Sequence, residues 1–195
     1  MASVPDSPEA FFTQYLPEQF GSITEDLSGR SSAGSVTFRV TGAGEWSLAL
    51  KDGALVVLPE QQSDVIVQVT LNDTAFAALV VAAAREHEAT FTKLEHQAKI
   101  IRLITLDDTR VNQVRQIAGS VALSVTDEDA VHQVTITPGA REPNLTAPEC
   151  RVSCHQRDFE EIQAGKVQPM QLVMTGKMRI EGNAQIPMAL MAVLA

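Results

Sequence analysis

Basic side chains are scarce in this sequence, and their scarcity limits the partners that the chain can bind. The 195 residues include 15 Lys and Arg against 24 Asp and Glu, which gives a formal net charge of −9 at pH 7. Nucleic-acid binding requires clusters of Lys and Arg against phosphate, and firm docking on anionic lipid headgroups requires them too. We therefore expect no nucleic-acid partner and at most transient membrane contact.

Long apolar runs are also absent. The two longest, residues 75–84 and 186–195, have ten residues each, whereas a membrane-spanning helix needs roughly 18 or more. The opening residues, Met1 to Asp6, lack the basic and apolar regions of a signal peptide, and the ending Val193-Leu194-Ala195 is not a peroxisomal signal. We therefore expect a cytoplasmic protein.

Cysteine and histidine are too few and too scattered to form a metal site. In a strand, Cys150 and Cys154 would lie about 13 Å apart at roughly 3.3 Å per residue. A disulfide requires Cα atoms within about 7 Å, so we expect two free, buried thiols. The His residues show no i, i+4 pair, and no nucleotide-binding loop or nucleophile elbow is present. We expect no cofactor, no metal and no enzymatic activity.

Apolar residues recur with two different periods, which predicts both strands and helices. Helices are predicted from Ser7-Pro8-Glu9 onward and over residues 74–87 and 108–118, each with a capping residue at its start. The spacing of apolar residues in 93–106 fits a helix, whereas its β-branched composition favours a strand. Strands are predicted by alternation over residues 36–41, 45–51, 54–58 and 65–71.

The pattern begins again after residue 118. Gly34 to Thr41 matches Gly119 to Thr126 at five of eight positions, with an offset of 85. His132, Val134 and Ile136 then stand where Trp46, Leu48 and Leu50 stood. We therefore predict an internal duplication, with an N-terminal helix and loop in residues 1–33 and repeats in 34–118 and 119–195. By analogy with residues 177–181, we predict that residues 99–106 form a strand.

The last thirty residues are the most distinctive part of the chain. Met178 and Ile180 alternate with charged residues, as in a strand with one buried face. Residues 186–195 have no charged or hydrogen-bonding side chain, so a helix there must be buried or must line an apolar space. Five of the six Met lie in this region. Such residues either fill gaps in a core or form a surface that adapts to variable apolar partners.

An ordered set of motifs in this region resembles the C-terminal signature of the sterol carrier protein 2 (SCP-2) family. The motifs are Asp158-Phe159, Gly165-Lys166, Gln168-Pro169, Met174 and the run from Gly176 to Asn183. The segments Phe11 to Phe20 and Trp46 to Gly53 are similar to the family's opening helix and its second strand and turn. The resemblance implies an α+β fold, with a twisted, mostly antiparallel sheet backed by helices. It also implies an apolar tunnel that takes sterols, fatty acyl chains or related lipids.

These features predict a non-enzymatic protein that binds or transfers an apolar lipid. The first half lacks the Gly-Lys frame, and its closing helix is polar on one side, so we expect the lipid in the second half. A rival arrangement is one enlarged sheet with a single cavity and the first half as scaffold. The alternative function is a structural or dimerisation module with a closed cavity, whose apolar tail packs inside the domain or against the second subunit of a homodimer. The predicted lipid-contacting residues are Phe159, Ile162, Met170, Met174, Met178, Ile186, Leu190 and Met191.

Overall fold

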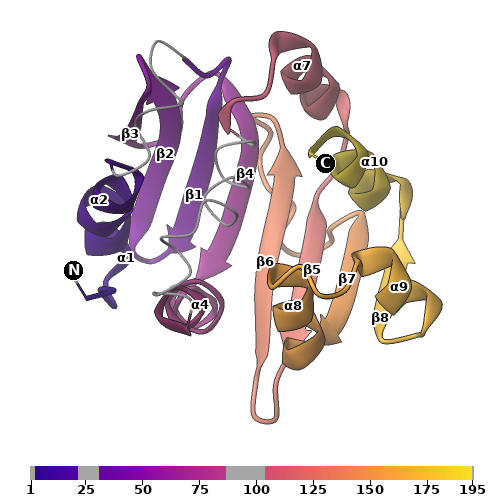
Figure 1. The fold of residues 1–195 in the computed structure, drawn as a ribbon. Coiled ribbons are helices and arrows are strands. Elements are labelled where there is room, and N and C mark those ends of the chain that lie inside the picture. Colours follow the sequence, from indigo (N-terminus) through magenta and orange to yellow (C-terminus); the bar gives the residue numbers. More distant parts are fainter. Residues whose placement is uncertain (1–2, 22–30, 87–103, 195) are drawn as a thin grey trace.

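The protein is built on one eight-stranded sheet. The computed structural model describes residues 3–21, 31–86 and 104–194, and its strands follow the order β3-β2-β1-β4-β6-β5-β7-β8 (Figure 1). Two neighbouring pairs, β1–β4 and β5–β7, are parallel and the rest are antiparallel. The strands are β1 (Ser35–Thr41), β2 (Gly44–Lys51), β3 (Ala54–Pro59), β4 (Val65–Asn72), β5 (Val121–Thr126), β6 (Val131–Pro138), β7 (Cys150–His155) and β8 (Met178–Gly182).

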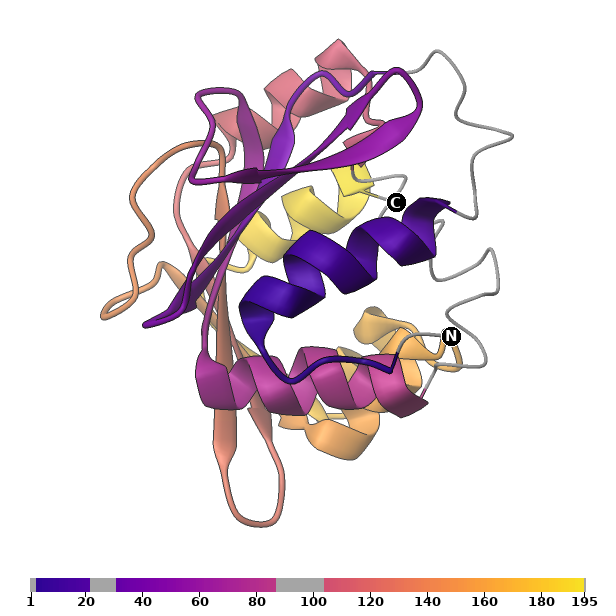
Figure 2. The same cartoon turned by 90° about the vertical axis from the view of Figure 1, so that its left-hand side faces the viewer.

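Helices from both halves lie on the same side of this sheet (Figure 2). The predicted α+β fold, a mostly antiparallel sheet backed by helices, is confirmed. As predicted, side chains of Ser7 and Asp107 accept hydrogen bonds from helical N–H groups, at Ala10 and Arg110 respectively. The helical elements are α1 (Pro8–Ala10), η1 (Phe11–Tyr15), α2 (Leu16–Gly21), α3 (Asp73–Phe76), η2 (Ala77–Val81), α4 (Ala82–Glu86), α7 (Asp108–Gln116), α8 (Gln156–Gln163), α9 (Pro169–Met174) and α10 (Gln185–Leu194).

The sheet consists of two four-stranded halves with similar strand arrangements. In the first half β1 lies between β2 and β4, and in the second half β5 lies between β6 and β7. Antiparallel pairing between β4 and β6 joins the halves, from Val67 opposite Pro138 to Leu71 opposite Val134. The repeated arrangement is the one expected from a duplicated sequence. The boundaries proposed for the two repeats stay a prediction.

The register of the second hairpin differs from the one that the sequence match predicts. Strand β1 pairs Phe38 with Trp46, and β5 pairs Leu123 with Val134. Val134 therefore takes the position of Trp46, and the assignment of His132 to that position was wrong. The reason is turn length: β1 and β2 are separated by two residues, whereas four residues, 127–130, separate β5 and β6.

The strand predicted over residues 99–106 is not formed in the part that can be checked. Ile104 is helical and Thr105 lies in a turn, while residues 99–103 lie outside the described residues. The corresponding strand of the second half, β8, pairs with β7. In the first half the matching edge belongs to β4, and β6 already occupies it. A strand edge offers one row of hydrogen-bonding groups, so no further strand can pair there.

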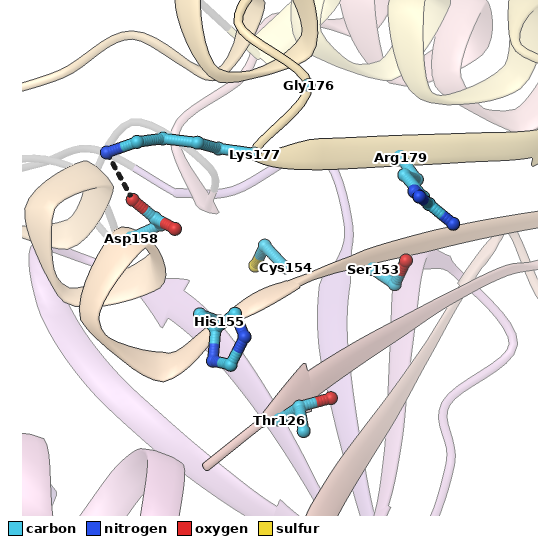
Figure 3. Close-up of a pocket in the computed structure, with 8 residues that line it drawn as sticks. All are labelled: Thr126, Ser153, Cys154, His155, Asp158, Gly176, Lys177 and Arg179. Atoms are coloured by element: carbon cyan, nitrogen blue, oxygen red, sulfur yellow. Dashed lines mark hydrogen bonds and ion pairs between the residues drawn. The ribbon is translucent and has the colours of Figure 1, made fainter. Parts of the chain in front are cut away.

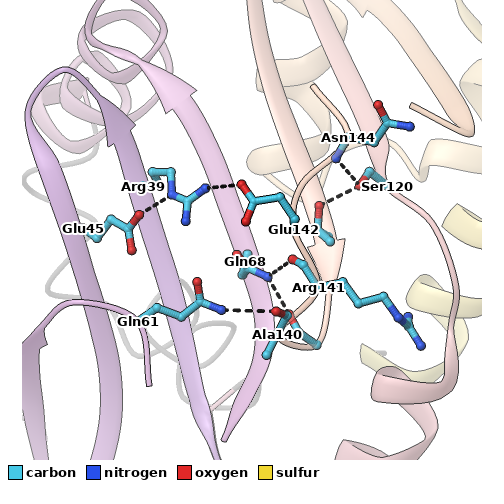
Figure 4. Close-up of polar contacts among 11 residues, drawn as sticks. Arg39, Glu45, Gln61, Gln68, Ser120, Ala140, Arg141, Glu142 and Asn144 are labelled. Carbon is cyan, nitrogen blue, oxygen red and sulfur yellow. Dashed lines mark hydrogen bonds and ion pairs between the residues drawn. The ribbon is translucent and has the colours of Figure 1, made fainter. Parts of the chain in front are cut away.

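A loop after β6 fastens the two halves on the side of the sheet opposite the helices (Figure 4). The Gln68 side-chain amide, on β4, donates to the carbonyl oxygens of Gly139 at 2.8 Å and Arg141 at 2.5 Å. The Arg39 guanidinium, on β1, donates to the Glu142 carboxylate at 3.3 Å. The Ser120 hydroxyl accepts the Asn144 N–H at 3.1 Å. The loop therefore contacts both halves through polar groups.

The N-terminal helical segment fills the inner side of the first half with aromatic rings. The Phe12 ring stacks on Trp46 at a centroid distance of 5.0 Å and contacts Phe38 at 5.1 Å and Phe76 at 5.8 Å. All but Phe38 are buried, and the cluster extends through other residues of the same segment. Aromatic pairs of this kind add specific contacts to the hydrophobic gain, so the segment belongs to the core.

We predict that Phe12→Ala lowers the free energy of unfolding by about 3–5 kcal/mol, the cost of removing a buried aromatic ring and leaving a cavity. Urea unfolding followed by circular dichroism measures this change. The control is Met174→Ala, whose side chain is exposed and whose removal costs within about 0.5 kcal/mol. A loss below about 1 kcal/mol for Phe12→Ala would contradict a structural role for the ring.

The last residue of β8, Gly182, must be glycine for a steric reason. Gly182 has φ of 86°, and a Cβ there would clash with the Glu149 carbonyl oxygen. That oxygen also accepts the Asn183 N–H at 2.8 Å, which fixes its position. Gly176 has a similar φ of 73°, but a Cβ would meet nothing within 4 Å. Substitutions at these two glycines therefore distinguish the cost of backbone strain from the cost of a steric clash.

We predict that Gly176→Ala costs about 1–2 kcal/mol, the strain of a left-handed alanine. Gly182→Ala carries this strain and a clash, which adds roughly 1–3 kcal/mol. Thermal or urea unfolding of both variants gives the difference. Equal losses would show that the Glu149 carbonyl moves aside without cost.

Candidate functional site

An apolar cavity of about 290 Å³ lies between the second half of the sheet and helices α8, α9 and α10. Every lining residue is apolar. The strands contribute Val121, Leu123, Ile136, Val152, Met178 and Ile180, and the helices contribute Phe159, Ile162, Pro169, Met170, Val173, Pro187 and Met191. With no polar group at its wall, the cavity can hold a ligand only through hydrophobic burial and dispersion.

The floor of the cavity follows from strand alternation. Leu123, Val152 and Ile180 are direct neighbours across β5, β7 and β8, so their side chains form a row on one face of the sheet. Their sequence neighbours point to the opposite face because the side-chain period of a strand is two. The alternation read from the sequence therefore builds the floor.

The helices form the walls and the rim. On α8, Phe159 and Ile162 are three residues apart and share one side of the helix. Met170 on α9 and Met191 on α10 line the cavity and are also 41% and 37% exposed. The rim of the cavity therefore reaches the protein surface at flexible thioether side chains.

The structure brings together five of the eight residues predicted to contact lipid. Phe159, Ile162, Met170, Met178 and Met191 line the cavity. Met174 does not, because its side chain is 82% exposed. Ile186 and Leu190 are buried in the hydrophobic core and do not line the cavity. The role of these residues in lipid binding stays a prediction.

Sequence reasoning missed much of the cavity wall. The floor residues Val121, Leu123, Ile136, Val152 and Ile180 were treated only as strand residues, although their alternation was visible. The apolar closing helix divides in a way that its composition does not show. Pro187 and Met191 line the cavity, and Met188 is exposed.

The buried histidine has a structural partner. His132 Nε2 lies 3.0 Å from Asp127 Oδ2, at the turn between β5 and β6. The N–H of Asp129, the His132 ring and the N–H of Ala130 hold the pKa of Asp127 below its usual value. These hydrogen bonds stabilise the turn between β5 and β6.

Among the described residues, no group of three or more His, Cys, Asp or Glu could hold a metal ion.

A comparison with models of protein families shows to which family this chain is related. The model of the SCP-2 sterol transfer family matches residues 21–94 and 100–195. The chain belongs to the SCP-2 sterol transfer family. The two matched segments are consistent with tandem parts, as the internal duplication predicts. No curated protein matches the chain significantly.

Three of the solved structures that match the chain are sterol carrier proteins by name. The apo form of sterol carrier protein 2 from Yarrowia lipolytica is 14% identical, over 45% of this chain and 74% of that one, with a TM-score of 0.34. Domain 2 of the Helicoverpa armigera sterol carrier protein is 18% identical, over 57% and 85%, with a TM-score of 0.35. Palmitated SCP2L2 from Aedes aegypti is 15% identical, over 45% and 92%, with a TM-score of 0.33.

Both thiols are free and buried, as predicted. Burial, together with the nearby Asp158 carboxylate, raises the pKa of the Cys154 thiol to about 11 from its ordinary value of 9.0. Burial also raises the pKa of Cys150. Thiolates are the reactive form, so neither residue is suited to nucleophilic chemistry at neutral pH.

In the described parts of the chain, no helix has the length and apolar character needed to cross a bilayer.

We predict slow alkylation of Cys154. In a Cys150→Ala variant, which leaves one thiol, a rise in pKa from 9.0 to about 11 reduces the thiolate fraction at pH 8 by about a hundredfold. Iodoacetamide should therefore react at least about a hundred times faster in guanidinium than with the folded protein. Because the folded pKa is raised, the native rate should keep rising above pH 9. A plateau near pH 9 would contradict the raised pKa.

Proposed function

We propose that the second half of the chain binds the apolar part of a lipid in the cavity between the sheet and helices α8, α9 and α10. The protein acts as a non-enzymatic carrier in the cytoplasm. The observation that supports this most directly is the cavity itself, which has about 290 Å³, an entirely apolar wall and a partly exposed rim. Its volume lies at the lower end of ligand pockets, which span about 300–1,000 Å³.

Hydrophobic burial alone is sufficient for useful affinity. Each buried CH₂ contributes about 0.8 kcal/mol, so a chain of about 16 carbons gains on the order of 12 kcal/mol. Association costs about 4 kcal/mol or more, which leaves about 8 kcal/mol, or roughly micromolar affinity. A chain of this length extends beyond the cavity, so about 8 kcal/mol is an upper limit that is reached only where the methionine rim covers the rest of the chain.

Broad specificity follows from the same wall. No polar side chain lines the cavity, so no group is positioned to select a particular hydroxyl or carboxylate. The methionines at the rim adapt to ligands of different shape. Sterols, fatty acids and acyl chains are therefore all candidate ligands, and membrane contact during exchange is transient.

Aromatic side chains fill the corresponding space of the first half, which favours a single lipid site in the second half. By strand register, Phe38 and Trp46 occupy the positions of Leu123 and Val134. The Phe12 ring packs against both of these aromatic side chains. The space beside them is thus filled by the protein itself, whereas Leu123 borders the open cavity.

The cavity is tested by two methionines on the same helix. We predict that Met170→Trp places an indole at the rim and weakens binding of a fluorescent fatty acid by about tenfold or more, equivalent to about 1.4 kcal/mol. Met174→Trp makes the same chemical change outside the cavity and should leave affinity unchanged. Saturable binding by the wild-type protein is the prerequisite. Equal effects of the two substitutions, or no saturable binding at tens of micromolar, would reject the site.

A dimerisation module is the second candidate, because Met170, Met174, Met188 and Met191 expose apolar surface on or beside α9 and α10. A second subunit that covered these residues would close the cavity rim. Native mass spectrometry of protein purified without detergent distinguishes the candidates. A monomer carrying a lipid adduct supports the carrier, whereas a lipid-free dimer that Met174→Glu dissociates supports the module.

A further inference from the structure

A second pocket, of about 380 Å³, lies at one end of β5, β7 and β8 and has a different character (Figure 3). Its wall is polar and charged, unlike that of the apolar cavity. The lining residues are Thr126, Ser153, Cys154, His155, Asp158, Gly176, Lys177 and Arg179.

The position of this pocket follows from the strand period. Arg179 lies between Met178 and Ile180, which line the apolar cavity, so its side chain belongs to the other face of β8. Ser153 is its direct neighbour on β7. The Arg179 side chain therefore lies on the face of β8 opposite the apolar cavity, and the two pockets share no lining residue.

Positive charge exceeds negative charge in the wall. Lys177 and Arg179 are the two basic residues of the wall, and Asp158 is the one carboxylate that lines the pocket. Lys177 Nζ lies 3.1 Å from Asp158 Oδ1, so the two charges largely offset each other. Arg179 extends away from that pair and has no ion-pair partner among the described residues (Figure 3). A local positive charge of this kind is unusual in a chain with net charge −9.

Neutral hydrogen-bonding groups line the same pocket as the unpaired guanidinium. Within the described residues, neither the Ser153 hydroxyl nor the Thr126 hydroxyl has a hydrogen-bond partner. Helix α8 also starts at this pocket, and its capping residue, His155, makes no side-chain hydrogen bond to the first turn. The N–H groups of a helix start favour a nearby anion. Each of these groups can donate a hydrogen bond, and together they match an acceptor with several oxygens.

We propose that this pocket binds a phosphate-type oxyanion. The Arg179 guanidinium holds two of its oxygens through parallel hydrogen bonds, the geometry that arginine favours for phosphate. The hydroxyls of Ser153 and Thr126 donate to the remaining oxygens, and Lys177 adds charge from the side of Asp158. A divalent cation is disfavoured here because it would meet two cations and one already paired carboxylate.

The oxyanion site is tested by titrating inorganic phosphate into the full chain at low ionic strength, where screening is weak. Two-dimensional ¹H–¹⁵N NMR identifies the residues whose amides shift. We expect saturable shifts centred on residues 153–158 and 176–179, and a loss of affinity of about tenfold or more in Arg179→Gln. Arg110→Gln removes the same charge from an exposed position on α7 and should leave affinity unchanged.

A second titration distinguishes free phosphate from a phosphorylated lipid. Dihexanoyl phosphatidic acid and dihexanoyl phosphatidylcholine share their acyl chains, but the terminal phosphate is unblocked only in the first. Arg179-dependent binding of inorganic phosphate supports a free ion, and Arg179-dependent binding confined to the phosphatidic acid supports a lipid headgroup. The proposal is overturned if neither inorganic phosphate nor the phosphatidic acid binds, or if Arg179→Gln and Arg110→Gln weaken binding equally.

The oxyanion site and the lipid cavity are independent in this design. Met170→Trp obstructs the apolar cavity and should leave the phosphate-induced shifts unchanged. Arg179→Gln should in turn leave the binding of the fluorescent fatty acid unchanged. The melting temperature of each unliganded variant shows that the fold persists. Failure of one proposal therefore leaves a distinct signature from failure of the other.

Discussion

The antiparallel pairing of β4 with β6 determines the rest of this structure. Five residue pairs join the strands and turn two similar halves into one sheet. A strand has only two edges, and β1 already pairs with one edge of β4. Because β6 takes the other, the first half has no place for a counterpart of β8. The halves therefore diverge at this seam, and the second half alone acquires a strand that carries both cavity-lining and pocket-lining residues.

The two halves use corresponding positions for opposite purposes. Phe38 on β1 and Phe76 on α3 pack against the Phe12 ring, which the N-terminal segment supplies. Their counterparts, Leu123 on β5 and Phe159 on α8, border an apolar cavity. Filling the first space stabilises the fold, because the aromatic rings are removed from water and contact one another. The second space stays open under the short helix α9 and the closing helix α10, so stability and ligand capacity are divided between the halves.

Sequence patterns specified the fold class because they concern local geometry. The alternation in residues 36–41 and 121–126 reports which face of a strand is buried, and the caps at Ser7 and Asp107 report where helices begin. The family membership could also be predicted from the sequence, because the run from Gly176 to Asn183 resembles the C-terminal signature of the SCP-2 family. Gly182 in that run meets a constraint that is not local, namely the carbonyl of Glu149.

The features that sequence reasoning missed depend on competition between distant segments. Residues 99–106 have strand-like composition, but no pattern in them reveals that β6 occupies the edge they would need. The shifted register of β6 depends on a turn whose length changes which residue faces Leu123. Likewise, Ile186 and Pro187 are adjacent and apolar, yet one lies in the core and the other lines the cavity. That division is set by where α10 rests on the sheet, which no local period encodes.

The basic residues on β8 and just before it have an ordinary structural role that bears on the oxyanion site. β8 is an edge strand, and charged side chains on such a strand discourage pairing with another chain. Protection of this kind requires only that Lys177 and Arg179 be charged and exposed. It does not require a pocket, free hydroxyls on the neighbouring strands, or the start of a helix beside the guanidinium. These additional features line the same pocket as Arg179, and edge protection gives no reason for them, whereas the proposed oxyanion site accounts for each one.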